Sequence, residues 1–163
     1  MNPMETTATY TLRPVHEADE TTLLAIYAAS RADEMALVPW DEATKDAFLR
    51  SQLMAQQEHY RSYFPNAAHE LILVEGEAVG RLYVDRRESE IRILDVTLLE
   101  QARGHEIGTR IIQELMKEAA DRDQSLSIYV ESYSQSLGLF QRLGFVKTDE
   151  NGALWLMVWR ADS

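Results

Sequence analysis

The residues best suited to bind a ligand lie in segment 100–108, Glu-Gln-Ala-Arg-Gly-His-Glu-Ile-Gly, which joins a predicted strand to a predicted helix. A glycine loop at a helix N-terminus presents unpaired backbone N–H groups and the positive end of the helix dipole, which together bind phosphate. The spacing differs from the Gly-x-Gly-x-x-Gly loop of dinucleotide-binding folds and from the Gly-Lys-Ser/Thr of a P-loop. On glycine content alone, a simple tight turn is the better interpretation.

Other kinds of chemistry find little support in the residue types. The chain has no cysteine, which excludes a thiol nucleophile, a thiolate zinc site and an iron–sulfur cluster. The histidines do not have the spacing of metal ligands, and we expect no metal site; they are His16, His59, His69 and His105. A Gly-x-Ser-x-Gly nucleophile motif is also missing, which argues against a hydrolase.

The elements that position this loop follow from the apolar pattern. Helices are predicted over 17–30, 41–65, 107–119 and 134–143, and strands over 9–13, 71–74, 79–84, 91–98, 126–130, 145–148 and 154–160. Turns at Glu75-Gly76-Glu77 and Asn151-Gly152 predict antiparallel hairpins, whereas the strand–helix–strand unit at 91–130 predicts a parallel pair. The fold class is therefore α/β with a mixed sheet.

The strand before the loop changes its phase. Ile91 and Ile93 share one face of an ideal strand, while Leu94, Val96 and Leu98 share the other. A phase change in mid-strand indicates a β-bulge near Leu94-Asp95. A strand buried on both faces would explain the same pattern without a bulge, and the pattern alone does not separate the two.

Length and charge limit the class of protein further. A chain of 163 residues fits one domain, and 27 acidic against 16 basic residues give a net charge of −11. This charge argues against a nucleic-acid partner and fits either an amine-bearing partner or solubility alone. The N-terminus lacks the pattern of a signal peptide and no apolar run is long enough to span a bilayer, so we expect a cytoplasmic protein without membrane contact.

Two motifs resemble those of the GNAT N-acyltransferase superfamily. Segment 101–108 resembles its Gln/Arg-x-x-Gly-x-Gly/Ala acyl-CoA loop, and segment 134–145 is similar to its Asn-x-Ala-x-x-Leu-Tyr-x-x-x-Gly-Phe signature. The resemblance implies a GNAT fold over 1–163, with the motif core at about 71–160 and acceptor-side helices at about 15–64. That fold is a mixed, mostly antiparallel sheet of six to seven strands with flanking helices. Its splayed central strand pair admits pantetheine, which favours the bulge.

The resemblance also implies an N-acetyltransferase that moves an acetyl group from acetyl-CoA directly to a small amine or a peptide or protein amine. The implied acetyl-CoA contacts are Val96, Thr97, Leu98, Arg103, Gly104, His105, Glu106, Ile107, Gly108, Thr109, Ser134 and Phe140. Alignment with the family's strand carboxylate makes Glu90 the expected general base, although an ordinary solvated glutamate at a strand start is an equal alternative. The last hairpin often pairs subunits in this family, which implies a homodimer.

Three positions depart from the family pattern. Glu106 brings a negative charge to the pyrophosphate loop, where the family has Gly or Ala. Phe140 replaces the tyrosine that commonly protonates the departing thiolate, so either Tyr133, Tyr129 or water takes that role or the step is slow. Ser134 replaces an asparagine, which is a milder change because the serine hydroxyl also donates and accepts hydrogen bonds. These departures leave open the alternative of a non-catalytic GNAT-fold binding or regulatory protein with weakened CoA binding.

Overall fold

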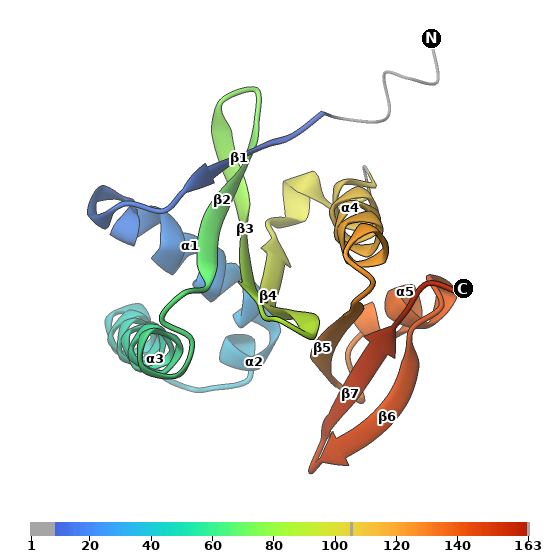
Figure 1. Cartoon of the computed structure of the whole chain (residues 1–163). Coiled ribbons are helices and arrows are strands. Elements are labelled where there is room, and N and C mark those ends of the chain that lie inside the picture. Colours follow the sequence, from blue (N-terminus) through green and yellow to red (C-terminus); the bar gives the residue numbers. More distant parts are fainter. Residues whose placement is uncertain (1–8, 105, 163) are drawn as a thin grey trace, which may run out of the picture.

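The computed structural model describes residues 9–104 and 106–162 (Figure 1). The strands of this part of the chain are β1 (Thr11–Pro14), β2 (Ala68–Val74), β3 (Glu77–Arg86), β4 (Glu90–Leu98), β5 (Ser125–Glu131), β6 (Val146–Asn151) and β7 (Leu154–Trp159). Its α-helices are α1 (Glu20–Ser30), α2 (Ala32–Ala36), α3 (Glu42–Tyr63), α4 (Ile107–Asp121) and α5 (Ser136–Arg142). Short 3-10 turns, η2 (Glu17–Asp19) and η3 (Glu100–Ala102), precede α1 and the ligand loop.

The strands form one seven-stranded sheet in the order β1-β2-β3-β4-β5-β7-β6. Within it β4 and β5 pair in parallel, because α4 carries the chain back between them, and the other neighbours pair antiparallel. The β2–β3 hairpin turns at Glu75 and Gly76, with φ of 52° and 82°. Two successive positive φ values define a type I′ turn, whose twist matches that of the strands. The predicted mixed, mostly antiparallel sheet is confirmed.

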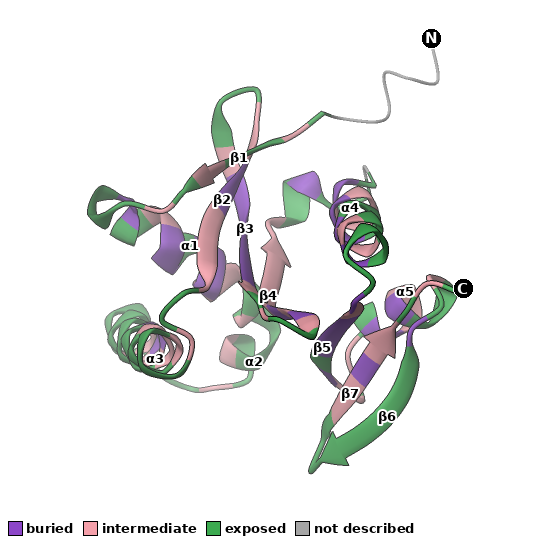
Figure 2. Cartoon of the chain, viewed as in Figure 1, coloured by how far each residue is buried: buried purple, intermediate pink, exposed green. Residues whose placement is uncertain are grey.

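Helices cover both faces of the sheet, and each face has its own core (Figure 2). On one face Leu82 and Val84 of β3 pack with the apolar stripe of α4 and with Phe140 of α5. On the other face α1 and α3 bury Ile26 and Leu53 against Leu71 of β2. The helix predicted over 107–119 is confirmed, and its inner face is apolar: the buried members are Ile107, Ile111, Ile112, Leu115 and Ala119.

The helix ends follow from local chemistry. The Asp41 carboxylate accepts from the Thr44 N–H at 2.7 Å and caps α3. Gly144, at φ 101°, ends α5 in a Schellman motif, in which Phe145 N–H donates to the Phe140 carbonyl at 3.0 Å. Ser134 lies one position before the N-cap of α5, and its hydroxyl accepts from the Ser136 N–H at 3.2 Å.

Two of the differences from the sequence prediction follow from local burial. Helix α2 is absent from the predicted elements; it has five residues, none of them buried, so no apolar stripe marks it. Strand β2 begins at Ala68 rather than Leu71, because half-buried Ala68, His69 and Glu70 extend the ladder with β3. No helix in the described part of the chain combines the length and apolar character needed to cross a membrane.

Candidate functional site

A bulge in β4 shapes the centre of the sheet. Tyr83 of β3 pairs with Asp95 and the next residue, Val84, pairs with Ile93, so Leu94 has no partner in the ladder. The carbonyl oxygen of Leu94 accepts a hydrogen bond from the hydroxyl of Tyr60, on α3, at 3.1 Å. The bulge therefore explains the phase change in the sequence, and the alternative of a regular strand buried on both faces is wrong.

Beyond the bulge, β4 and β5 separate. Their parallel pairing runs from Glu90–Ser125 to Ile93–Ile128 and then stops. The rest of β5, as far as Glu131, continues to pair with β7. Figure 1 shows the two strands diverging at this point, with α4 above the gap. The predicted splayed central strand pair is confirmed.

The segment Val96–Leu98 forms the β4 side of this opening. The Leu99 N–H donates to the Val79 carbonyl of β3 at 2.7 Å, and alternation along the strand turns the backbone groups of Leu98 and Val96 to the opposite edge. The Leu98 carbonyl also accepts from Nε of Arg103 at 3.0 Å. The side chains of Val96 and Leu98 pack on the α4 core, whereas Thr97 faces the other side of the sheet, where it bonds Asp95.

The loop after β4 leads directly into α4. Gly104 has φ 81°, and the exposed Glu106 is the N-cap of α4 in the left-handed region, at φ 63°. The side chain of Glu106 makes no cap hydrogen bond. His105, predicted as a contact of acetyl-CoA, lies outside the described residues.

The first turn of α4 has the properties of an anion site. Ile107 is buried and anchors the turn, and Thr109 is half-buried. A Cβ on Gly108 would meet Cδ1 of Leu98 at 3.4 Å, so the helix lies close to β4. The N–H groups of a first helical turn have no partner within the helix. These groups fit a phosphate, and the exposed carboxylate of Glu106 opposes it by like charge.

A pocket of about 240 Å³ lies on the α1–α3 face, at the splayed end of β4 and β5. It is lined by Tyr27, Ser30, Arg31, Gln56, Arg81, Asp95, Thr97, Glu131 and Ser134. Sequence reasoning found Thr97 and Ser134 but missed the charged members, which are Arg31, Arg81, Asp95 and Glu131. For Arg81 and Asp95 the available signal was a charged residue between apolar neighbours, in the segments 80–82 and 94–96.

Arg81 and Asp95 form the charged centre of this pocket. Nε of Arg81 donates to Oδ2 of Asp95 at 2.6 Å, and the Arg81 side chain is only 2% exposed. Thr97 also donates its hydroxyl to the Asp95 carboxylate, at 3.1 Å. The Asp95 carboxylate thus accepts hydrogen bonds from Arg81 and from Thr97.

Residues at the end of β5 approach the pocket from the other strand. Glu131 and Ser134 line it, and Tyr133 lies between them with 74% of its side chain exposed. A hydrogen bond with the Glu131 carboxylate raises the pKa of the Tyr133 phenol, so the phenol is protonated at neutral pH. Tyr129 is the other tyrosine expected to be able to protonate the thiolate. Its ring lies under the Arg92 guanidinium, with 5.1 Å between the ring centroid and Cζ of Arg92.

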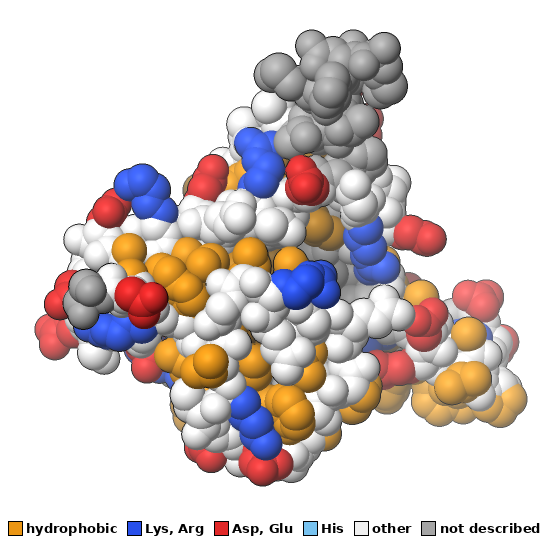
Figure 3. Space-filling model, turned by 90° about the vertical axis from the view of Figure 1, so that its right-hand side faces the viewer, with side chains coloured by type: hydrophobic (Ala, Val, Ile, Leu, Met, Phe, Trp, Pro, Cys, Tyr) orange, Lys and Arg blue, Asp and Glu red, His pale blue; other side chains and the backbone are white. Residues whose placement is uncertain are grey.

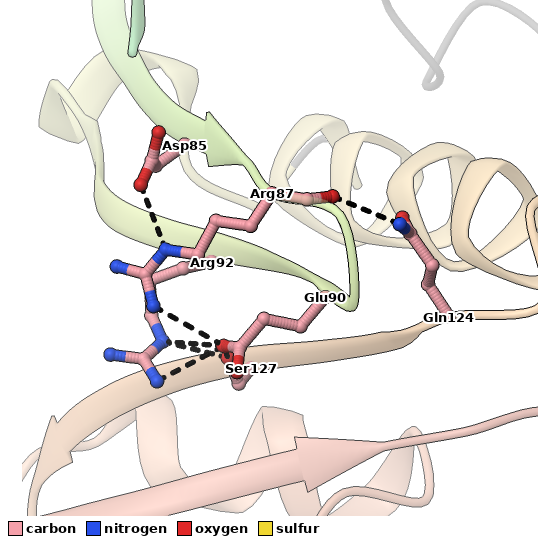
Figure 4. A network of polar contacts seen from close by, with 6 residues as sticks. All are labelled: Asp85, Arg87, Glu90, Arg92, Gln124 and Ser127. Carbon is pink, nitrogen blue, oxygen red and sulfur yellow. Dashed lines mark hydrogen bonds and ion pairs between the residues drawn. The ribbon is translucent and has the colours of Figure 1, made fainter. Parts of the chain in front are cut away.

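Glu90 lies away from the pocket, at the closed end of the β4–β5 pair (Figure 4). Its Oε1 accepts from the Ser127 hydroxyl at 2.6 Å and from Nη2 of Arg92 at 3.0 Å. Seven residues separate Glu90 from Thr97, roughly 20 Å along an extended strand. The structure therefore does not bring Glu90 together with the other predicted site residues.

Phe140 is also apart from the opening. Its ring is 2% exposed and packs edge to face on Phe145, with centroids 5.2 Å apart. The structure places it in the core beneath α4 and α5 rather than on the pocket wall. The described residues include no group of three or more metal-ligating side chains placed to hold an ion.

The net charge of −11 is not concentrated around one site on the face drawn in Figure 3. Acidic side chains there form small separate groups, several of them with Lys or Arg beside them. In the pocket, two carboxylates, Asp95 and Glu131, stand against two guanidiniums, Arg31 and Arg81. The pocket is therefore balanced in charge although the chain is acidic.

A bulged and splayed strand pair beside a helix N-terminus is the architecture that the two motifs implied. Residues 30–153 match the family model of the acetyltransferase (GNAT) domain. Since this match covers well over half of the chain, the protein belongs to the GNAT acetyltransferase family. No curated protein matches the chain at a significant level of sequence similarity.

Solved structures show the same fold at low identity. The PaiA N-acetyltransferase of Thermoplasma acidophilum, in complex with coenzyme A, aligns with TM-score 0.68 and 13% identity over 94% of this chain and 99% of that chain. An acetyltransferase from Thermus thermophilus aligns with TM-score 0.68 and 19% identity over 94% of this chain and 97% of that chain. A GNAT family acetyltransferase from Elizabethkingia anophelis with acetyl-CoA bound aligns with TM-score 0.60 and 16% identity. That alignment covers 93% of this chain and 98% of that chain.

Proposed function

We propose that the protein transfers an acetyl group from acetyl-CoA directly to the amine of an acceptor. The observation that carries this proposal is the splay, which leaves the backbone edge of Val96 and Leu98 without a strand partner beside the first turn of α4. Related structures hold coenzyme A or acetyl-CoA, according to their descriptions. The edge and the helix turn together offer hydrogen bonds for pantetheine and for pyrophosphate.

The contacts with acetyl-CoA come from two stretches and the end of β5. We propose that the outward backbone groups of Val96 and Leu98 bind pantetheine, whereas Thr97 between them pairs with Arg81 of β3. The loop from Arg103 to Thr109 binds the pyrophosphate. Ser134 lines the pocket, and we propose that its hydroxyl bonds the same ligand. Phe140 contributes packing rather than a polar contact, since its ring is buried.

The reaction needs one group that accepts a proton and one that donates a proton. The acceptor nitrogen gives up a proton and bonds to the acetyl carbon, the carbon–sulfur bond breaks, and the CoA sulfur leaves and takes a proton. We assign the base to Glu131, because it lines the pocket at the open end of β5. Tyr133, protonated and adjacent, is the proposed acid. Glu90 remains the prediction from alignment, and its place in an ion-pair network argues for a structural role.

Titration of the protein with CoA and acetyl-CoA, followed by an assay of CoA thiol release with a panel of amines, tests this function. We expect saturable binding and amine-dependent release. In Gly108→Val, the added methyl groups extend toward Leu98 and the helix N-terminus, so binding is expected to fall while the unfolding transition remains cooperative. Absence of binding at millimolar ligand would overturn the proposal. Binding without release for any amine would favour the non-catalytic alternative.

The cytoplasmic location and the homodimer that we expect from the sequence both remain predictions. The structure offers one surface for the second: β6 is the last strand of the sheet and all six of its residues are exposed. An unpaired strand edge is a template for pairing with another chain. Sedimentation over a range of protein concentrations tests for the dimer.

A further inference from the structure

Arg81 is a buried cation whose hydrogen bonds are incomplete. Its side chain is 2% exposed, Nε donates to Asp95 at 2.6 Å, and Nη2 donates to Oε1 of Gln56 at 2.5 Å. Nη1 is buried and finds no acceptor among the described residues. A buried donor without an acceptor costs free energy, and a guanidinium has five N–H groups to satisfy. The site is therefore built to take one more acceptor.

A second guanidinium of the same pocket has an unused donor. Arg31 follows the end of α1, and its Nη1 donates to Oε1 of Glu34 at 3.1 Å. Cζ of Arg31 lies 5.4 Å from the centroid of the Tyr27 ring, which helps to hold the side chain in place. Nε of Arg31 is buried and also has no acceptor among the described residues. Two arginines from separate elements thus line one pocket with donors to spare.

The chemistry of these donors selects the group they bind. Planar guanidinium forks match the two oxygens of a carboxylate, which accepts several charge-assisted hydrogen bonds. An amine without an acidic group would leave both arginine donors unsatisfied. The pocket volume of about 240 Å³ lies below the roughly 300–1,000 Å³ of sites for drug-sized ligands, which fits a small acceptor.

We propose that the acceptor is an amino acid, and that Arg81 and Arg31 bind its carboxylate. This inference rests on the proposed acetyl transfer and names the acceptor class for the same site. With the carboxylate on the arginines, the amine lies toward Glu131 and Thr97 at the opening between β4 and β5. One amino acid and one acetyl-CoA give one N-acetyl amino acid and one CoA, and the proton of the amine leaves through Glu131.

The test compares each amino acid with its own amide, which keeps the amine and side chain and removes the negative charge. The panel holds the common amino acids and their amides where these exist. It also holds β-alanine, whose amine and carboxylate are farther apart, and simple diamines without a carboxylate. We expect CoA release with at least one amino acid, and a kcat/KM about 10-fold or more above that of its amide, as expected for hydrogen bonds to a charged group.

Variants locate the effect on the arginines. Arg31→Gln is expected to raise KM for the amino acid by about 10-fold and to change KM for the amide by less than about 2-fold. Arg50→Gln is the matched control, because Arg50 lies on α3 outside the pocket with its ion pairs to Asp46 and Glu20 on the surface. Arg81→Gln should show a larger effect, and Arg31→Gln keeps the test decisive if the loss of the buried Arg81 prevents folding.

A binding measurement without turnover separates this inference from the proposed function. In titrations of the CoA-saturated protein, the preferred amino acid should raise the melting temperature, its amide should not, and Arg31→Gln should abolish the shift. Equal kcat/KM for acids and amides would overturn the carboxylate site and leave acetyl transfer intact. Arg31-dependent binding without acetylation would retain the site and refute the activity. If the protein neither binds nor acetylates any amino acid, the inference is overturned.

Discussion

The hydroxyl of Tyr60 on α3 donates to the carbonyl oxygen of Leu94 on β4 across 3.1 Å. A bulge takes one residue out of the strand ladder, and the carbonyl that it frees needs another donor when it is away from water. The Tyr60 ring is fixed edge to face on Tyr83, with centroids 4.9 Å apart. Burial, with the nearby Asp95 carboxylate, raises the pKa of Tyr60 to about 12, so the hydroxyl stays a donor at neutral pH. This bond ties α3 to Leu94, the first residue of β4 beyond its pairing with β5.

Replacing Tyr60 by phenylalanine removes this donor and keeps the ring. We expect the free energy of unfolding to fall by about 1 kcal/mol, the usual net value of one hydrogen bond. Denaturant unfolding measures the change, and Tyr63→Phe on the same helix, where the side chain is 70% exposed, is the control. CoA affinity should fall together with stability, because the bulge shapes the opening. An unchanged unfolding energy would show that Leu94 is satisfied without Tyr60.

The bulge was predictable only in part from a single strand. The phase change between Ile93 and Leu94 is visible there, and an inserted residue brings Val96 and Leu98 back to the face of Ile91 and Ile93. A strand buried on both faces fitted the same pattern, and the resemblance favoured the bulge. The splay was predictable only through the resemblance, since the point where β4 and β5 separate depends on a register between two strands. The same limit applies to Arg81 and Asp95. Each was visible as a charged residue between apolar neighbours, but their pairing depends on the β3–β4 register.

Family position is a weaker guide for Glu90 and Phe140. Alignment with a strand carboxylate points to Glu90, but the register places it in the closed part of the pair, where Arg92 and Ser127 hold it. The family pattern makes Phe140 a contact of acetyl-CoA, whereas its ring packs in the core. In both cases sequence spacing determines the position along the chain and not the surroundings of the side chain.

Glu106→Gly should improve both stability and CoA binding. Glu106 has φ 63°, a backbone conformation that glycine adopts without strain, and its charge lies at the N-terminus of α4 where an anion should bind. We expect a gain of about 0.5–1 kcal/mol in unfolding free energy, and about 2- to 5-fold tighter CoA binding at low salt.

The matched control for this change is Glu75→Gly. Glu75 has a similar φ of 52° and the same charge, but it lies in the β2–β3 turn. It should gain comparable stability and leave CoA affinity unchanged. Equal effects of the two variants on CoA affinity would show that the Glu106 carboxylate does not act on the ligand.

His69 should make the protein sensitive to mild acid. Burial, with the nearby Arg81, lowers the pKa of His69 to about 4, and its ring stacks on Tyr83 with centroids 4.1 Å apart. The unfolded chain takes up this proton at a pH of about 6.5. The stability due to neutral His69 is therefore complete above pH 6.5 or so, and is lost as the pH falls toward 4.

His69→Phe isolates this contribution, because it keeps the stacked ring and cannot titrate. Wild type should lose roughly 2 kcal/mol more than the variant between pH 7 and pH 4.5, after allowance for the partly exposed ring. Unfolding by urea at several pH values measures the difference. Parallel pH profiles for the two proteins would show that the folded state accepts the proton without penalty.

Two carboxylates, Glu90 and Glu131, compete for the role of general base, and the same substitution distinguishes them. Glu131→Gln should lower kcat by about 10²–10⁴-fold, the usual contribution of acid–base catalysis, and remove the acidic limb of the pH–rate profile. Its stability should change little, because Glu131 is the last residue of β5 and lies at the open end of the pair.

Glu90→Gln should lower the stability of the protein and leave kcat nearly unchanged. The variant loses the charge that Arg92 contacts at 3.0 Å, while the Ser127 hydroxyl keeps an amide oxygen as acceptor. We expect about 1–3 kcal/mol less stability, because the half-buried Arg92 guanidinium loses its carboxylate partner. The kcat of the folded protein should remain within about 2-fold, since the side chain lies roughly 20 Å along the strand from Thr97. A large loss of kcat in Glu90→Gln, with the pH profile of Glu131→Gln unchanged, would instead assign the base to Glu90.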